Sequence, residues 1–495
     1  MRRLVFVFSA LLLSACTMGR DYTRPAIETP AQYRGADAGP QAESLATLKW
    51  PELFQDPVLT RLVTTALEQN FDLRVAAERV LQARALYRFQ RADQFPTVDA
   101  SANLVAARAS RTGANRAIPP NADTDVTYTE VGFSLGWEID IWGRLRRLTE
   151  AARAQYLATE AAQYGILTTV VADVIQTYLE LRALDLELQI AHRTRDVATD
   201  GLRLTEARES SGVATALDVQ QAAQLLHTAL GSIAGIERDI ALTENALSLL
   251  LGRYPDEIPR GHPLESLRIP SAVPAGLPSA LLQRRPDIRQ AEQELIAANA
   301  RIGAARAEYF PRISLTGFFG AQSRALSALL SGPAGVWSAS AGAAVPIFNA
   351  GRTSANVRVA EAVQRELVVN YQRTIYTAFR EVSDALAGHR KTAEQRVEQE
   401  RLVAALHAST RLSLQRYQGG VDNYLQVLDA QRNLFQGELE LARLRQRELA
   451  TVVQLYRALG GGWSPNGGAA SGSRQSLPSD SAAHTPDTTE KRREW

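Results

Sequence analysis

The sequence predicts a mixed, mainly α-helical chain built from two copies of one unit. Three observations support this fold class. Two stretches far apart resemble each other at a fixed spacing, proline-free charged segments of helical character fill most of each copy, and short segments between them alternate apolar and polar residues. Alternation with a period of two is typical of β-strands with two different faces. We therefore expect long helices interrupted once in each copy by a β-hairpin.

The repeat is clearest in RESSGVATALDVQQA at 208–222 and RYQGGVDNYLQVLDA at 416–430. Identical residues in the two stretches lie 208 positions apart, among them Arg208 and Arg416, Gly212 and Gly420, and Val213 and Val421. A spacing this long indicates two domain-sized copies rather than a solenoid. We predict the copies at 57–255 and 279–463, joined by a proline-rich linker at 256–278.

The N-terminus has the features of a secretory signal peptide over residues 1–15. Two arginines precede an apolar stretch that is too short to span a bilayer as a helix. The following Leu-Ser-Ala-Cys at 13–16 resembles the bacterial lipobox, which implies a covalent lipid on Cys16, the single cysteine of the chain. Thr17 follows where aspartate is associated with inner-membrane retention, so the resemblance points to the outer membrane. Residues 16–56 are expected to form an extended lipidated arm.

Each copy is predicted to contain three helices. The first copy gives 57–94, 144–211 and 213–251, and the second gives 279–309, 352–418 and 421–459. A helix over 144–211 would be about 100 Å long, which is unusual in a compact domain. The two shorter helices of a copy, laid end to end, would match its long helix in length. This match suggests the wall of a helical cylinder.

The β-hairpins are predicted at 97–142 and 312–348. In the first, Phe133, Leu135 and Trp137 alternate with Ser134 and Gly136. A strand with one apolar and one polar face over about ten residues is typical of a transmembrane barrel. A half-buried soluble hairpin alternates in the same way. Aromatic residues near the strand ends and the lipobox favour the membrane. Four strands cannot close a barrel, so several chains would have to contribute, and the sequence does not choose between two and three.

Together these motifs resemble the TolC-like outer membrane efflux ducts, specifically the lipoprotein branch of OprM-like outer membrane factors of RND-type tripartite efflux systems. The matching motifs are the lipobox, NFDLRVA and RPDIRQAE, FP before each hairpin, DIWGR and PIFNAGR after them, GVDNYLQVLDAQR and the closing GGGW. The resemblance implies a homotrimer with an outer-membrane β-barrel of four strands per chain, continuous with a long periplasmic α-helical barrel. It also implies a periplasmic adaptor (membrane fusion) protein and an inner-membrane RND-type pump as partners. The implied function is a passive exit duct for small molecules such as drugs.

The two turns at 212–213 and 420–421 are expected at the periplasmic end, where the resemblance places an iris-like gate. The residues that match gate positions are Leu425, Gln426, Asp429, Asp218 and Tyr417. Leu425 and Asp429 are four residues apart and share a helix face, so threefold symmetry would produce a leucine ring and an aspartate ring. Asp218 and Tyr417 are expected to form a hydrogen-bonded clasp between neighbouring helix pairs.

The same turns are the expected contacts for the adaptor, through Arg208, Gly212, Val213, Arg416, Gly420 and Val421. The glycines could instead serve only the turn geometry. An arginine found in some family members is replaced here by Asp422, and a second acidic residue by Gln426.

Other classes of function receive no support from the sequence. A net charge of +2 argues against nucleic-acid binding, and the six histidines show no metal-ligand spacing. We expect no catalytic residues, no metal and no cofactor other than the covalent lipid. Residues 464–495 read as a disordered tail. Two alternatives remain open: a lipid-anchored helical scaffold or adhesin without a pore, and a duct for protein secretion.

Overall fold

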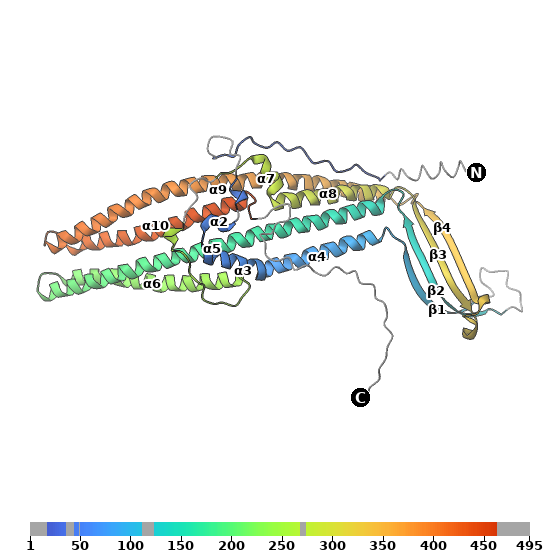
Figure 1. Cartoon of the computed structure of the whole chain (residues 1–495), viewed down its shortest axis with the longest axis horizontal. Helices are drawn as coiled ribbons and strands as arrows, with labels where there is room; N and C mark the ends of the chain where they lie inside the picture. The colour runs from blue at the N-terminus through green and yellow to red at the C-terminus, as the bar shows by residue number, and fades with distance from the viewer. Residues whose placement is uncertain (1–16, 36–43, 49, 111–122, 268–273, 463–495) are drawn as a thin grey trace, which may run out of the picture. The chain divides into compact units, whose positions relative to one another are not determined.

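The computed structural model describes residues 17–35, 44–48, 50–110, 123–267 and 274–462. The predicted signal peptide, Cys16 and the C-terminal tail lie outside these ranges. The described part combines long helices with one four-stranded antiparallel sheet (Figure 1). None of the helices in this part of the chain has both the length and the apolar character needed to cross a membrane.

Four helices form two antiparallel pairs of matched length. The two long ones, α5 (Arg144–Ser210) and α9 (Arg352–Gln418), have 67 residues each. Their partners, α6 (Ala216–Leu250) and α10 (Tyr424–Ala458), have 35 residues each. α5 packs along α6 and α9 along α10 (Figure 1). Both partner helices begin three residues later than the sequence suggested, because the turn before each one is longer.

The helix predicted over 57–94 is in fact two helices, α3 (Pro57–Gln69) and α4 (Phe71–Ala92). Asn70 separates them with an extended ψ of 133°. Its side-chain oxygen accepts hydrogen bonds from the backbone N–H groups of Asp72 and Leu73 at 2.9 and 3.2 Å. An asparagine that caps a new helix in this way competes with continuation of the old one, and neither proline nor glycine marks the break.

The helix predicted over 279–309 is also wrong as a single element. It divides into α7 (Pro278–Arg284) and α8 (Pro286–Ala307). Arg285 between them is extended, with φ −75° and ψ 125°, because the ring of Pro286 disfavours the helical conformation in the residue before it.

The shorter helices meet end to end, as their lengths predict. The Asn70 amide at the start of α4 donates to the carbonyl oxygen of Leu250 at the end of α6, at 2.8 Å. The Arg285 guanidinium at the start of α8 donates to the carbonyl oxygen of Ala458 at the end of α10, at 3.0 Å. α6 and α4 therefore continue each other along α5. In the same way, α10 and α8 continue each other along α9.

The sheet has the simple order β1-β2-β3-β4, with every neighbouring pair antiparallel. Its strands are β1 (Thr97–Arg108), β2 (Asp125–Ile139), β3 (Arg312–Ser323) and β4 (Gly335–Ala344). The 3-10 turns η3 (Leu326–Ala328) and η4 (Gly332–Ala334) connect β3 to β4. β2 leads directly into α5, so the sheet lies at the N-terminal end of that long helix (Figure 1).

The largest hydrophobic core surrounds the middle of α5 and the ends of α6 and α10. Short elements cover it there: η1 (Leu45–Thr47), α2 (Trp50–Phe54), α3, η2 (Leu264–Ser266) and α7. Tyr178 of α5 is fully buried, and its hydroxyl donates to the Asp56 carboxylate at 3.1 Å. This core fixes the halfway point between the sheet and the turns at the far end of α5.

Candidate functional site

The sheet has one apolar face that continues across all four strands. The register places Ala100, Phe133, Phe319 and Trp337 side by side, and it places Trp137 beside Leu315 and Ala341. Directly paired residues in neighbouring strands point to the same face. Phe319 and Trp337 are 72% and 75% exposed, although both are large hydrophobic side chains. An exposed apolar surface of this continuity indicates contact with lipid or with another protein.

The opposite face of the sheet is polar along most of its length. The rows there contain Asn103, Glu130 and Gln322, and Thr97, Thr316 and Ser340. Phe318 is an exception on this face. Its ring lies against Gly132 and Gly320, where a Cβ on Gly132 would come within 2.6 Å of it. The sheet is therefore two-sided, with an apolar and a polar surface back to back.

Both outer strands of the sheet have a free side within the described part of the chain. β1 pairs only with β2, and β4 pairs only with β3. These edges are 12 and 10 residues long. A long unpaired edge beside an apolar face is a template for pairing with another strand.

The two turns at the other end of α5 and α9 share one geometry. Gly212 and Gly420 have positive φ angles of 76° and 74°. Val213 N–H donates to Arg208 O at 2.8 Å, and Val421 N–H donates to Arg416 O at 2.9 Å. A 6→1 backbone hydrogen bond that encloses a glycine in the left-handed conformation is the Schellman motif, which ends a helix. The turn geometry alone requires both glycines, and Val213 and Val421 are each left 66% exposed.

The predicted gate residues of the second turn lie on one exposed face of α10. Leu425, Gln426 and Asp429 are exposed, whereas Tyr424, Val427 and Leu428 between them are buried. The buried set holds α10 in place, and the exposed set is available to a neighbouring chain or to solvent.

The predicted clasp between Asp218 and Tyr417 is absent from the described chain. The Asp218 carboxylate accepts from Thr215 N and Thr215 Oγ1, both at 2.8 Å, and forms a capping box at the start of α6. The Tyr417 hydroxyl is buried and has no hydrogen-bond partner. The local cap outcompetes the long-range bond because Thr215 and Asp218 are already neighbours in the first turn.

Arg416 and Asp422 form an ion pair that closes the second turn. Arg416 Nε and Nη2 donate to the two Asp422 carboxylate oxygens at 2.6 and 3.0 Å. These hydrogen bonds hold the pKa of Asp422 below its ordinary value. Arg416, predicted as an adaptor contact, therefore also has a role within its own loop.

The start of the N-terminal arm is docked at the junction of sheet and helices. Arg147, only 4% exposed, donates to the carbonyl oxygens of Met18 and Gly19 at 3.1 and 3.2 Å and to Asp21 at 2.8 Å. Met18 N–H donates to Trp142 O at 3.0 Å. Residue 17, next to the predicted lipid site, is thus held beside the end of β2 even though Cys16 itself lies outside the described residues.

A second buried charge holds the next part of the arm. Glu292 of α8 accepts two hydrogen bonds from Arg24, both at 2.6 Å. Close backbone contact also matters here, since a Cβ on Gly303 would lie 2.5 Å from the carbonyl oxygen of Met18. The sequence predicts an extended arm but does not reveal either anchoring charge, because both charges lie more than 120 residues away in the chain.

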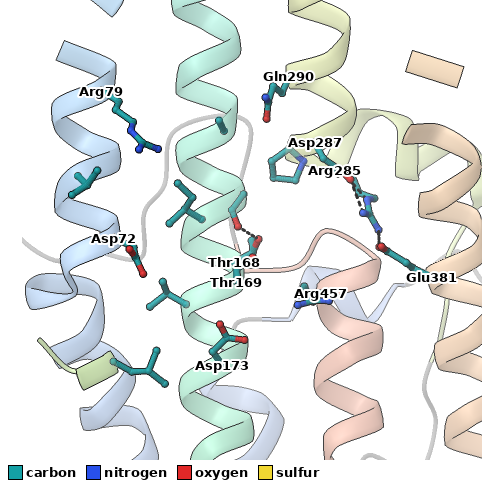
Figure 2. Close-up of a pocket in the computed structure, with 17 residues that line it drawn as sticks. Asp72, Arg79, Thr168, Thr169, Asp173, Arg285, Asp287, Gln290, Glu381 and Arg457 are labelled. Carbon is teal, nitrogen blue, oxygen red and sulfur yellow. Dashed lines mark hydrogen bonds and ion pairs between the residues drawn. The ribbon is translucent and has the colours of Figure 1, made fainter. Parts of the chain in front are cut away.

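A charged groove of about 670 Å³ lies beside the junctions of the shorter helices. Figure 2 shows Asp72 and Arg79 from α4, Asp173 from α5 and Arg457 from α10 around it. Burial raises the pKa of Asp173. Val170 of the main core also lines this groove, so the groove borders the core at the middle of the chain.

None of the site residues predicted from the sequence lines this groove. Part of its charge is neutralised internally, since Arg285 pairs with Asp287 at 2.6 Å and Glu381 at 2.7 Å (Figure 2). The short side chains of Gly165, Thr168 and Thr169 in α5 leave space for this groove. They are the one sequence signal that could have revealed it.

Across the residues that the structure describes, no group of three or more histidine, cysteine, aspartate or glutamate side chains could hold a metal ion.

Comparison with known proteins agrees with this architecture over nearly the whole chain. The family described as "Outer membrane efflux protein" matches residues 62–253 and 277–461. The solvent efflux pump outer membrane protein SrpC of Pseudomonas putida is 42% identical over 92% of this chain and 98% of its own length. The cation efflux system protein CusC of Escherichia coli O6:H1 is 37% identical over 92% and 97%. The crystal structure of the open state of the Neisseria gonorrhoeae MtrE outer membrane channel matches with a TM-score of 0.80 at 30% identity, covering 90% of this chain and 98% of that one.

The fold and its two-faced sheet, taken with these relatives, define an outer-membrane efflux channel protein. More particularly, the chain belongs to the outer membrane efflux protein family, whose profile covers both of its halves.

Proposed function

We propose that this chain is one subunit of a homotrimeric outer-membrane duct through which small molecules leave the periplasm passively. The observation that carries the proposal is the sheet, with an apolar face that runs unbroken across four strands and a polar face behind it. A transmembrane barrel needs this combination, with lipid outside and water inside.

The free edges of the sheet support assembly from several copies. Four strands are too few to close a barrel, and open edges are not tolerated in lipid. Pairing β4 of one copy with β1 of the next would remove both edges, and three copies would supply twelve strands, the number implied by the resemblance to trimeric ducts.

The outer helices offer a second surface for the same assembly. α4 and α9 flank α5 and α8 on either side, and each exposes large apolar side chains. Leu86 and Phe89 of α4 are 65% and 72% exposed, and Val359 and Val369 of α9 are 61% and 62% exposed. Contact between α4 of one copy and α9 of the next would bury these residues and continue the cylinder below the sheet.

We further propose that Cys16 carries a covalent lipid, including palmitate, that anchors the chain in the outer membrane. The docked position of residue 17 beside Arg147 and the segment after β2 supports this, because a lipid attached one residue earlier would lie at the junction of sheet and helices.

The turns at the far end of α5 and α9 are proposed as the periplasmic gate and as the docking surface for a periplasmic adaptor, with an inner-membrane RND-type pump as the energy source. α5 alone separates them from the sheet by about 100 Å, given its 67 residues. Exposed Leu425 and Asp429 would face the axis of the trimer, and exposed Val213 and Val421 would face the adaptor.

The test is single-channel recording from the purified full-length protein in a planar lipid bilayer. The proposal expects discrete conductance steps, and crosslinking in the same preparation should show three copies. A protein without conductance that still inserts would indicate a lipid-anchored scaffold or adhesin instead. Loss of a secreted protein, but of no small-molecule efflux, in a deletion strain would indicate protein secretion.

A further inference from the structure

The two turns of one chain touch each other through a small apolar cluster, which we call the tip cluster. It contains Ala198, Ala222, Leu225, Tyr417, Tyr424, Val427 and Leu428. The first three belong to α5 and α6, and the other four belong to α9 and α10. The tip cluster is therefore the place where one helix pair is held against the other at this end of the chain.

Tyr417 is the member of the tip cluster that meets a charge from the opposite pair. The Arg208 guanidinium carbon lies 4.7 Å from the centroid of the Tyr417 ring. Tyr424 meets the same ring edge-on, with a centroid distance of 5.3 Å and an interplanar angle of 71°. Tyr417 is only 4% exposed, so this cation–π contact is largely shielded from water, where such contacts are strongest.

The contact depends on the face of the ring and not on its hydroxyl. Within the described residues, the hydroxyls of Tyr417 and Tyr424 are buried without a hydrogen-bond partner, as is Nε of Arg208. Asp218 accepts hydrogen bonds from Thr215, and Asp422 is paired with Arg416. Glu209 is next to Arg208 in the sequence, but the two side chains form no ion pair within the described residues. Arg208 is thus left with the aromatic ring as its partner.

One sequence difference explains why Arg208 crosses to the other turn and Arg416 does not. Both arginines stand at the same place in their Schellman turns, each accepting the hydrogen bond from a valine N–H. Six residues after Arg416 comes Asp422, which binds it. Six residues after Arg208 comes Ala214, which cannot. Because the first turn has no acid at the position equivalent to Asp422, Arg208 is not drawn into its own loop and instead stacks on Tyr417.

We propose that Arg208 is the latch between the two turns of each chain, a positioning residue that holds α9 and α10 against α5 and α6 while the gate is closed. This inference rests on the proposed gate function and assigns it a residue that the sequence had suggested only for adaptor contact. Opening then requires the guanidinium to leave the ring.

The test compares five substitutions in the full-length protein. Arg208→Ala and Tyr417→Leu remove one partner each, Arg208→Lys keeps the charge but loses the planar stack, and Tyr417→Phe keeps the ring. Arg203→Ala is the matched control, because Arg203 lies on the same helix, is 78% exposed and pairs only locally with Asp200.

Two measurements are made on each variant. One is the open fraction of single channels, and the other is the distance between spin labels at Val213→Cys and Val421→Cys in a protein whose Cys16 is replaced by Ser. A contact of this kind predicts about a fivefold rise in the open-to-closed ratio for Arg208→Ala and for Tyr417→Leu, with no further rise in the double variant. The open-to-closed ratio of Arg208→Lys should lie between those of the wild type and Arg208→Ala. The ratio should rise less in Tyr417→Phe than in Tyr417→Leu.

Tyr417→Phe behaving like Tyr417→Leu would overturn the latch, because the hydroxyl would then matter. So would spin-label distances in Arg208→Ala that match those in Arg203→Ala. Wild-type protein that never conducts would instead contradict the proposed duct, while the label distances would still report on the latch. Thermal unfolding of every variant shows whether a change in distance reflects the latch or a misfolded chain.

Discussion

The side-chain amide of Asn70 donates a hydrogen bond to the carbonyl oxygen of Leu250, 180 residues later, at 2.8 Å. The same side chain caps α4 through its oxygen. One buried residue thus ends α3, starts α4 and joins α4 to α6. The line of helix beside α5 depends on it.

Replacement of Asn70 separates these roles. Asn70→Ala removes both and should lower the free energy of unfolding by about 2 kcal/mol, half from the cap and half from the junction. Asn70→Ser keeps a good cap but is too short to reach Leu250, so it should lose only about 1 kcal/mol. Chemical unfolding followed by circular dichroism measures both, with exposed Thr64→Ala as control. Equal stability of Asn70→Ser and the wild type would show that the junction contributes nothing.

Much of the architecture is visible in the sequence because it depends on periodicity. The long helices and the alternating strands, from Phe133 to Trp137 for example, bury or expose side chains with a regular period. The breaks at Asn70 and Arg285 were missed because capping and a residue before proline act over two or three positions. Within one chain the Asp218 carboxylate caps α6 through Thr215 and does not reach Tyr417, and this local contact was also not foreseen.

The contacts that matter most at the candidate site could not be read from sequence. Arg208 and Tyr417 lie on different helix pairs, and Arg147 and Met18 are 129 residues apart. Such pairs depend on the packing of elements that are far apart in the chain, and a single sequence does not report that packing. The repeat did show where Ala214 replaces an acid, but not the consequence for Arg208.

Arg147 is expected to control the docking of the N-terminal arm. Arg147→Ala removes charge-assisted hydrogen bonds to Met18, Gly19 and Asp21, so docking should weaken by about 2 kcal/mol. Hydrogen exchange of residues 18–24 should then be about thirtyfold faster, while α5 stays protected. The exposed Arg153→Ala is the control on the same helix. Unchanged exchange in the arm would mean that Glu292 and Arg24 suffice to hold it.

The two faces of the sheet make a matched test possible on β4. Ala339 lies on the apolar face and Ser340 on the polar face, and both are small and exposed. Ala339→Arg should destabilise the inserted state by about 2–4 kcal/mol if its face contacts lipid, whereas Ser340→Arg should insert normally. The yield of folded trimer in the outer-membrane fraction measures both. Equal yields would contradict a lipid-facing apolar surface.

The ion pair between Arg416 and Asp422 predicts a pH dependence for the second turn. The pKa of Asp422 is lowered by its hydrogen bonds to Arg416, so the stabilisation is present at neutral pH and is lost as the pH falls through the lowered pKa. The hydrogen-exchange rate of residues 419–423, corrected for its intrinsic pH dependence, should therefore increase only at pH values below the ordinary pKa range of aspartate. Asp422→Asn should show the faster exchange already at neutral pH, with no further step. If the exchange rate of Asp422→Asn still rose as the pH fell, a different titrating group would be responsible.

Asp429 is expected to restrict the periplasmic end of the duct. It is exposed on the same face of α10 as Leu425, and three copies around an axis would form an acidic ring that attracts cations and repels anions. Asp429→Ala should therefore raise single-channel conductance and reduce the preference for cations, whereas Asp429→Glu should keep that preference. Asp200→Ala, an exposed aspartate in the shaft of α5, is the control for a general change in surface charge. Because conductance and ion preference are measured separately, a rise in conductance with unchanged preference would place Asp429 outside the pore and leave Leu425 to account for the gate.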